Sequence, residues 1–357
     1  MLGVLRQGAG RWDLPTLQTA LAEGGIFTEV EPAQLIRTLE DLPEGDLVAS
    51  VAASTGPWHP SQCIDSPGGG QHRGAFRRLG VEKGHETMNI TPSAAGRSVA
   101  LITGASSGIG RAYAERLAAD GHDLVIVARR GDRLEELKHR LESEHGVSVQ
   151  PLVADLSTEP GMREVDATAT DPRLEFVVDC AALAHYMPFL NLPPEQAEEL
   201  VKLNVLAPVR LIRAALPSMV ARKKGTIISI ATQLVFSATA GNPQLPQRAV
   251  YAATKAFLFA FIRLLALELR ESGVRLQVVC PGVVRTEFHT RQNMDMSHMP
   301  RLEPEQVVQA SMLALDRGET VCMPPLDDAD LLQRHDEAEN AILMGGMRPA
   351  LAERYSL

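Results

Sequence analysis

Short apolar segments alternate with helix-forming stretches from residue 98 onward, and this alternation constrains the fold more than any other feature of the chain. The segments 99–102 and 123–128 are almost wholly apolar, as strands of a parallel sheet covered on both faces should be. Between them, residues 111–120 have a helical composition that stops at Gly121. A strand, a helix and a second strand within about 30 residues form one βαβ unit.

The same pattern continues toward the end of the chain. Further strands are predicted at 150–154, 175–178, 226–231 and 275–280, and helices between them, notably over 195–223 and 251–272. Such regular alternation predicts an α/β fold with a doubly wound parallel sheet, whose ligand binds outside the carboxyl ends of the strands. We therefore expect a single catalytic domain over residues 98–357.

Residues 1–97 have a different character. Two weak helical patterns, at 15–23 and 32–42, precede a stretch rich in glycine and proline that offers too little periodic apolar surface for a core. We predict a poorly structured N-terminal extension, helical in part and then a linker. Two alternatives stay open: a small partner-binding element, or a start assigned too early, since Met88 lies just before the predicted domain.

The net charge of −9 on this 357-residue chain argues against nucleic acid or a membrane surface as a partner. The chain has no uninterrupted run of about 18 apolar residues, so we predict no membrane span. The four cysteines lack Cys-x-x-Cys spacing, so we expect buried free thiols and no metal site. Reduced thiols, and an N-terminus without a signal-peptide pattern, lead us to expect a cytoplasmic location.

The first strand leads into the loop Thr103-Gly-Ala-Ser-Ser-Gly-Ile-Gly110. A backbone that approaches a pyrophosphate closely needs residues without bulk, and the following helix presents free N–H groups and the positive end of its dipole. The three glycines meet the first need, and the two serines add hydroxyl donors. With a strand before it and a helix after it, the loop predicts a dinucleotide site. Its predicted cofactor-binding residues are Gly104, Ser106, Ser107, Gly108, Ile109 and Gly110.

The second strand ends at Ala128-Arg129-Arg130. An enzyme that prefers NAD often carries an acidic residue here for the ribose 2′-hydroxyl, whereas two guanidinium groups suit a 2′-phosphate. The alternative is a pair of solvated arginines that open a helix, where positive charge is mildly unfavourable against the dipole. We therefore predict that Arg129 and Arg130 bind NADP.

Farther along, Tyr251-Ala-Ala-Thr-Lys255 places a phenol and an ammonium group on one face of a predicted helix. Carbonyl reduction needs a hydride and a proton at opposite ends of one bond. A free tyrosine has a pKa of about 10, so it donates a proton well but is a poor base at neutral pH. A lysine about one turn away would stabilise the phenolate and lower that pKa. We expect Lys255 to hold the cofactor ribose as well.

Together these motifs resemble the short-chain dehydrogenase/reductase family over roughly residues 98–355, and they occur in the family's order. The resemblance implies a Rossmann fold and an NADP-preferring oxidoreductase that acts on CH–OH groups. It places Asn204 in the catalytic group, where it would anchor a water that relays protons to Lys255. It also implies further cofactor contacts, at the adenine from Asp155 and Leu156, and around the nicotinamide from Pro281, Gly282, Val284 and Thr286.

Two departures from the family pattern concern the site. Where the family has Asn-Asn-Ala-Gly after its fourth strand, this chain has Asp179-Cys-Ala-Ala182, which removes an anchoring amide and crowds the cofactor side. Where the family has its catalytic serine, the strand 226–231 delivers Thr232, whose hydroxyl still donates and accepts. Ser237 is the rival, since it lies nearer the family's usual distance from the tyrosine. We favour Thr232 because a strand end fixes geometry better than a long loop.

The segment 287–304 and the end of the fourth strand carry histidines and methionines. We expect His185, His289 and His298 to line or cover a pocket rather than to do chemistry. The methionines predict a deformable apolar lid, and an irregular surface loop is the alternative. They are Met294, Met296 and Met299.

The sequence therefore predicts an NADP-dependent oxidoreductase that interconverts a ketone or aldehyde and an alcohol, with Tyr251 as general acid/base. Its predicted catalytic residues are Tyr251, Lys255, Thr232 and Asn204. The apolar surface of the two long helices exceeds what one sheet face covers, which predicts a homodimer or homotetramer, as is common in the family. The alternative function is a catalytically weak NADP-binding sensor or scaffold, suggested by the departures at 179–182 and Thr232. The substrate, a small carbonyl compound or alcohol, is not specified by any motif.

Overall fold

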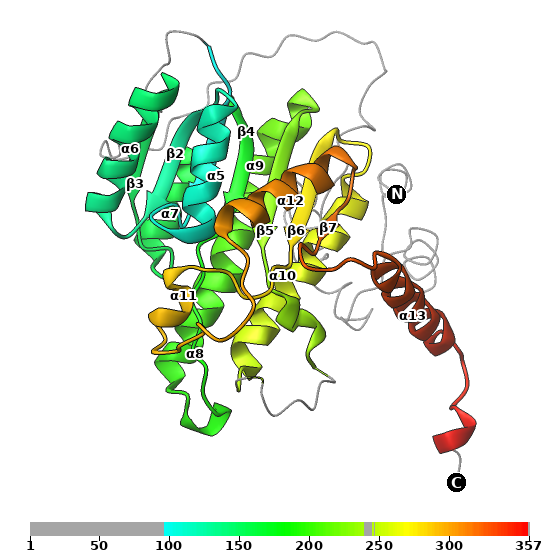
Figure 1. The fold of residues 1–357 in the computed structure, drawn as a ribbon. Coiled ribbons are helices and arrows are strands. Elements are labelled where there is room, and N and C mark those ends of the chain that lie inside the picture. The colour runs from blue at the N-terminus through cyan, green and yellow to red at the C-terminus, as the bar shows by residue number, and fades with distance from the viewer. Residues whose placement is uncertain (1–95, 239–244, 246, 356–357) are drawn as a thin grey trace, which may run out of the picture. The chain divides into compact units, whose positions relative to one another are not determined.

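A computed structural model of the chain describes residues 96–238, 245 and 247–355 (Figure 1). The predictions for the N-terminal extension, with its two helical patterns and Met88, lie outside these residues apart from the extension's last two positions. Within the described part, strands and helices alternate along the chain from β1 onward.

Seven strands form one sheet in the order β3-β2-β1-β4-β5-β6-β7, and every neighbouring pair is parallel. The predicted doubly wound parallel sheet is confirmed, and its six predicted strands are found within one residue at each end. The order changes direction between β1 and β4, the switch point where such sheets bind ligands. The strands are β1 (Val99–Thr103), β2 (Asp123–Ala128), β3 (Val149–Val153), β4 (Leu174–Asp179), β5 (Gly225–Ile230), β6 (Val274–Val279) and β7 (Val321–Cys322).

Helices cover both faces of the sheet, and Figure 1 shows α5 and α12 crossing one of them. Short 3-10 turns, η2 (Phe189–Asn191), η4 (Gln233–Phe236) and η5 (Glu353–Tyr355), complete the described elements. The helices are α5 (Gly108–Ala119), α6 (Gly131–His145), α7 (Glu159–Thr168), α8 (Pro194–Val201), α9 (Ala207–Arg222), α10 (Ala249–Glu268), α11 (Glu287–Thr290), α12 (Pro304–Asp316) and α13 (Asp330–Gly346).

The central strand β1 feeds two separate cores, because successive side chains of a strand point to opposite faces. Val99 and Leu101 join one core together with α7, α9 and α10. Ala100 and Ile102 join the other with α5, α6 and α12. All four side chains are fully buried, and burial of each large one stabilises the fold by about 1.5–3 kcal/mol. This explains why the strand's sequence is apolar throughout rather than alternating.

The predicted helix over 195–223 is interrupted by a π-helical segment, η3 (Lys202–Leu206), between α8 and α9. Pro208, at the start of α9, has no N–H to donate to the carbonyl of Asn204, and its ring crowds that carbonyl. A wider turn accommodates the clash, and such turns are frequent at functional sites. The candidate catalytic residue Asn204 lies inside this segment.

Two described helical stretches, Pro194–Arg222 and Ala249–Glu268, are long and apolar enough to cross a membrane by length and composition alone. In each, 39% of the most apolar window is buried inside the protein, where it packs on the sheet. Core helices pass the same test, so the predicted lack of a membrane span stays a prediction.

The cysteines of the described part carry free thiols, as predicted. Cys280 and Cys322 are buried, whereas Cys180 is half-buried. Burial raises the pKa of all three thiols to about 12, so they are protonated at neutral pH. Cys63 lies outside the described residues.

Candidate active site

The glycine loop between β1 and α5 depends on close backbone approaches. Gly108 has a φ of +56°, and a Cβ there would lie 2.7 Å from Cγ2 of Thr286. A Cβ at Gly110 would lie 2.5 Å from the carbonyl oxygen of Gly104. Any larger side chain at either position would collide with these atoms, so the loop in this conformation requires glycine at both.

The N-terminus of α5 opens onto the same space and fits an anion. Ser107 is the N-cap residue, it makes no side-chain capping hydrogen bond, and the first turn holds no acidic residue. The N–H groups of this turn and the positive end of the helix dipole favour a phosphate. The residues predicted to hold a pyrophosphate therefore fit such a group.

A cavity of about 800 Å³ lies at the carboxyl ends of the strands. Its wall is made by residues that follow each of the strands β1 to β6, together with α10 and the segment after β6. Gly110 and Asn204 are not on the wall, and the other predicted site residues are. These are Gly104, Ser106, Ser107, Gly108, Ile109, Arg129, Arg130, Asp155, Leu156, Thr232, Tyr251, Lys255, Pro281, Gly282, Val284 and Thr286.

Tyr251 and Lys255 lie one turn apart on α10, and both are almost completely buried within the cavity wall. Thr232 lies two residues after the end of β5, and its hydroxyl is close enough to Tyr251 to lower the pKa of that side chain slightly against the effect of burial. The Thr232 oxygen accepts a hydrogen bond from the N–H of Leu234 at 3.3 Å, which leaves its O–H free to donate. The strand end and the helix thus bring two hydroxyl groups together.

The rival residue Ser237 has other partners. Its hydroxyl donates to the carbonyl oxygen of Leu234 at 2.6 Å and accepts from Nε of Arg248 at 3.0 Å. Ser237 does not line the cavity that holds Tyr251. Its position supports the expectation that Thr232, rather than Ser237, replaces the family serine.

Burial dominates the protonation of the tyrosine and the lysine. Desolvation raises the pKa of Tyr251 well above its ordinary value, and the neighbouring Tyr186 raises it further. Desolvation lowers the pKa of Lys255, and the nearby carboxylate of Asp179 partly offsets this. The lysine Nζ donates to the carbonyl oxygen of Ile230 at 2.7 Å. A lowering of the tyrosine pKa by Lys255 is not seen in this structure and stays a prediction for the cofactor-bound protein.

Asn204 is fully buried and joins three parts of the site. Its Nδ2 donates to the carbonyl oxygen of Leu183 at 2.9 Å and to the hydroxyl of Thr254 at 3.1 Å. Its Oδ1 accepts from the N–H of Leu183 at 3.1 Å. The side chain therefore ties the π-helical segment to the loop after β4 and to α10, while its predicted role as a water anchor stays a prediction.

An aromatic cluster that the sequence did not predict surrounds Tyr251. The ring of Tyr186 meets that of Tyr251 edge to face with 5.4 Å between centroids, and Phe288 lies 6.0 Å away on another side. His289 stacks on Tyr186 at 6.3 Å. The sequence clue to Tyr186 was its position after the end of β4, on the ligand-binding side of the sheet. It was missed because a single aromatic residue in a loop matches no motif.

The segment after β6 forms part of the cavity wall. Two of the three histidines, His289 and His298, line the cavity, whereas His185 does not and has its Nε2 3.6 Å from a carboxylate oxygen of Glu199. All three predicted lid methionines also line it, and residues 291–301 form turns and irregular backbone, so the expected apolar lining and the alternative of an irregular surface loop both describe this segment. Their motion as a lid stays a prediction.

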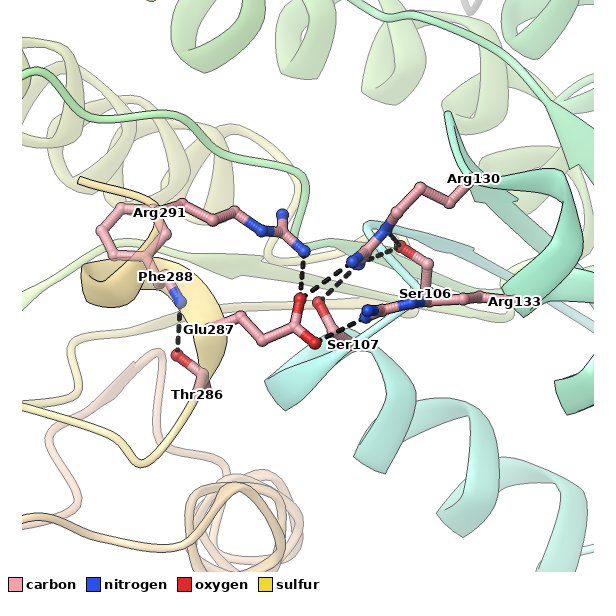
Figure 2. A network of polar contacts seen from close by, with 8 residues as sticks. All are labelled: Ser106, Ser107, Arg130, Arg133, Thr286, Glu287, Phe288 and Arg291. Atoms are coloured by element: carbon pink, nitrogen blue, oxygen red, sulfur yellow. Dashed lines mark hydrogen bonds and ion pairs between the residues drawn. The ribbon is translucent and has the colours of Figure 1, made fainter. Parts of the chain in front are cut away.

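The two arginines after β2 differ in their contacts. Arg129 is more than half exposed, and its nearest ionic partner is Asp155, with 3.9 Å between NH1 and Oδ2. Arg130 turns back toward the glycine loop, where its Nε and NH2 donate to the hydroxyl of Ser106 at 3.2 and 2.7 Å. Figure 2 shows this contact within a larger polar network. The pair thus presents one largely exposed and one anchored guanidinium group beside the pyrophosphate site.

Away from the cavity, His335, Asp336 and Glu339 bring three potential metal ligands together on α13. Arg263 already forms ion pairs with both carboxylates, at 2.8 and 2.9 Å. These contacts compete with any cation, and the expectation of no metal site stays a prediction.

Comparison with known proteins identifies the family of this chain. The profile of the short chain dehydrogenase family matches residues 98–297. The chain belongs to the short chain dehydrogenase family. Among solved structures, a short-chain dehydrogenase from Sphingobium yanoikuyae in complex with NADPH is 36% identical, with a TM-score of 0.69 over 72% of this chain and 100% of that chain. A bulky-bulky ketone specific alcohol dehydrogenase from Comamonas testosteroni is 33% identical, with a TM-score of 0.65 over 73% of this chain and 99% of that one.

Sequence relatives agree with the family. The very-long-chain 3-oxoacyl-CoA reductase-B of Danio rerio is 30% identical over 193 residues, which are 53% of this chain and 60% of that protein. The chain thus spans less than two thirds of that relative's length. The family profile confirms the predicted family, and with it the prediction of an oxidoreductase of this family. The architecture shared with the NADPH-bound relative confirms the predicted fold.

Proposed function

We propose that this short chain dehydrogenase is an NADP-dependent oxidoreductase that interconverts a moderately apolar ketone or aldehyde and its alcohol. One observation carries the proposal: a single cavity joins the glycine loop and the arginine pair to Tyr251, Thr232 and Lys255. A dinucleotide site alone would fit many enzymes. A proton donor at the other end of the same cavity is what carbonyl reduction requires.

The cofactor-binding residues divide into three groups. The glycine loop and the N-terminus of α5 would hold the pyrophosphate, and Arg129 and Arg130 would hold the 2′-phosphate. Asp155 and Leu156 would border the adenine, while Lys255 and the stretch Pro281–Thr286 would border the nicotinamide. When bound, NADPH supplies the hydride. The NADP preference is supported by the arginines and by the NADPH-bound relative, since no acidic residue ends β2.

The protein's own residues handle the proton. Tyr251 would donate its hydroxyl proton to the carbonyl oxygen, and the O–H of Thr232 would donate a hydrogen bond to that oxygen. Because burial raises the pKa of Tyr251, the hydroxyl is protonated at neutral pH, which suits the reductive direction. The reverse reaction needs a phenolate, and the Lys255 ammonium would then have to stabilise it.

The substrate would meet an apolar wall. Leu203, Leu234 and Phe288 line the cavity together with the three methionines of the segment after β6. Such a wall favours carbonyl compounds with apolar substituents, and the flexible methionine side chains adapt to different shapes. The relative from Comamonas testosteroni, described as specific for bulky-bulky ketones, supports this substrate class.

A catalytically weak sensor or scaffold is the second candidate. It is favoured by the buried Asp179 at a position where the family has asparagine, and by the lowered pKa of Lys255. A lysine that loses its charge would support neither ribose binding nor phenolate formation.

The assembly is proposed to be a cytoplasmic homodimer or homotetramer without nucleic-acid or membrane partners. Phe257, Leu264 and Leu267 on α10 are 42%, 60% and 67% exposed, so the residues that the structure describes leave this apolar helix face uncovered. Burial of such faces is a main driving force of association. Light scattering after size exclusion would report the number of copies.

The test is NADPH oxidation, followed by ultraviolet absorbance, across ketones, aldehydes and 3-oxoacyl thioesters. The control is Tyr251→Phe, which removes the proton donor and leaves the ring. Turnover that falls by about 10²- to 10⁴-fold in the variant supports the enzyme. Tight NADPH binding without turnover on any compound would favour the sensor or scaffold.

A further inference from the structure

The carboxylate of Glu287, at the start of α11, lies among three arginines (Figure 2). Its Oε2 is 2.8 Å from NH1 of Arg130 and 2.5 Å from NH2 of Arg291. Its Oε1 is 2.5 Å from NH1 of Arg133. Arg130 and Arg133 come from the N-terminal end of α6, and Arg291 from the C-terminal end of α11, so one carboxylate joins two distant parts of the chain.

The same Arg130 is a predicted ligand of the cofactor's 2′-phosphate, and its donors are nearly all engaged. Nε and NH2 donate to Ser106, NH2 also donates to Ser107 at 3.0 Å, and NH1 donates to Glu287. A guanidinium group has five N–H donors. A phosphate that approaches Arg130 for a bidentate contact must therefore replace a partner, and the Glu287 carboxylate is the only anion among those partners in the described residues.

The charge of Glu287 matches that of the expected ligand. Hydrogen bonds from Arg133 and Arg130 hold the pKa of the carboxyl group down at about 2, so it is ionised at every working pH. An anion held by several guanidinium groups is also the arrangement that binds a phosphate monoester. The network in Figure 2 is therefore an anion site whose present anion belongs to the protein.

We propose that Glu287 is a specificity-determining residue that occupies the place of the 2′-phosphate and is displaced from Arg130 when NADP(H) binds. The inference rests on the NADP-dependent function proposed above. NAD(H) carries a hydroxyl group at this position and leaves Glu287 in place. The residue thus weakens binding of the phosphorylated cofactor while making the position of α11 depend on which cofactor is present.

The consequence reaches the substrate end of the cavity through α11. Phe288 and His289 directly follow Glu287 in α11. The centroid of the Phe288 ring lies 6.0 Å from that of Tyr251, and the centroid of the His289 ring lies 6.3 Å from that of Tyr186. A movement of α11 away from the arginines therefore shifts the aromatic wall around the proposed proton donor. Binding of NADP(H), but not of NAD(H), would therefore change the position of this aromatic wall.

An opposite role is also physically consistent with a carboxylate among arginines. If Glu287 stayed in place and only oriented Arg130 and Arg133 for the phosphate, its removal would weaken NADP⁺ binding. The two roles therefore differ in the sign of one measurable change.

The experiment is isothermal titration of NADP⁺ and of NAD⁺ into the full chain and into Glu287→Gln, which keeps the shape and removes the charge. We expect the Kd of NADP⁺ to fall by about tenfold, as for loss of one competing charge-assisted contact, and that of NAD⁺ to change by less than about twofold. Glu115→Gln is the matched control, because Glu115 also bridges two arginines, Arg111 and Arg140, but lies off the cavity wall.

An unchanged or higher Kd of NADP⁺ in Glu287→Gln, with the control unaffected, overturns the inference. Wild-type protein that binds NADP⁺ no tighter than NAD⁺ contradicts the proposed NADP preference instead, and this comparison is made before any substitution. The two failures are thus told apart.

A second measurement needs no variant. Hydrogen exchange of the amides in 287–299 is compared in wild-type protein saturated with NADP⁺ and with NAD⁺. We expect faster exchange in the NADP⁺ complex, because α11 has lost its contact with the arginines. Equal exchange in the two complexes would show that the 2′-phosphate does not displace Glu287.

Discussion

The rings of Tyr186 and Tyr251 meet edge to face with 5.4 Å between their centroids. The contact joins the loop after β4 to α10 inside the cavity. Burial is the main cause of the raised pKa of Tyr251, and the neighbouring Tyr186 raises it further. Burial also raises the pKa of Tyr186 itself, to about 12. Tyr186 is therefore a positioning residue that adds to the effect of burial on the proposed acid.

We predict that Tyr186→Phe narrows the pH range of carbonyl reduction. Loss of the hydroxyl removes an interaction that raises the pKa of Tyr251, so this pKa falls. Reduction needs protonated Tyr251, and the alkaline limb of kcat/KM should move to lower pH. The measurement is a pH profile with NADPH. Phe288→Leu is the control, since Phe288 contacts the same ring without a hydroxyl, and an identical shift there would contradict the role of the Tyr186 hydroxyl.

Asp179→Asn restores the residue that the family usually has, and it should make Lys255 easier to deprotonate. The buried carboxylate raises the pKa of the lysine against the effect of desolvation. Without it the ammonium is lost at lower pH, and the alkaline limit of cofactor binding should fall. Kd values for NADP⁺ measured across a pH series test this.

The same residue predicts an acidic feature. Desolvation raises the pKa of Asp179 to about 6, so the carboxylate that stabilises Lys255 is present above that pH and is lost as the pH falls through it. The Kd of NADP⁺ for the wild-type protein should therefore change near pH 6, and Asp179→Asn should remove this change. A wild-type profile that is flat through this region would contradict the coupling.

The identity of the hydroxyl beside Tyr251 is testable by substitution. Thr232→Val keeps the shape and removes the donor, and we expect kcat to fall by about 10²-fold, as for loss of one donor to a developing oxyanion. Thr232→Ser should retain most of the activity. Ser237→Ala should stay within about threefold, because its hydroxyl bonds Leu234 and Arg248 away from the cavity. A larger loss in Ser237→Ala than in Thr232→Val would reverse the assignment.

Sequence patterns predicted the strands and the loop whose structure is determined by residues close together in the chain. The six strands are short apolar runs that both faces of the sheet bury, and their ends are found within one residue. The glycine loop was predictable because the space it needs is set by its own residues and the strand beside it. β7 (Val321–Cys322), with two residues, was too short for any pattern.

The remaining features depend on tertiary contacts. Arg130 and Glu287 are 157 positions apart, and no spacing rule connects them. The direction of the Tyr251 pKa was predicted from the nearby lysine, yet burial and Tyr186 dominate it in the structure. The break at η3 was visible in principle, since Pro208 follows Asn204 by four residues, but the apolar pattern of the long helix hid it.

Gly110→Ala should abolish tight cofactor binding. A Cβ at this position would lie 2.5 Å from the backbone oxygen of Gly104, so the loop itself must shift, and no flexible side chain can yield instead. We expect the Kd of NADP⁺ to rise by more than about tenfold and the protein to be destabilised by about 1–3 kcal/mol, as for overpacking elsewhere. Gly345→Ala on α13 is the control, because a Cβ there has nothing within 4 Å. Titration of NADP⁺ and thermal unfolding of both variants separate the two effects, and undiminished binding by Gly110→Ala would mean that the cofactor does not use this loop.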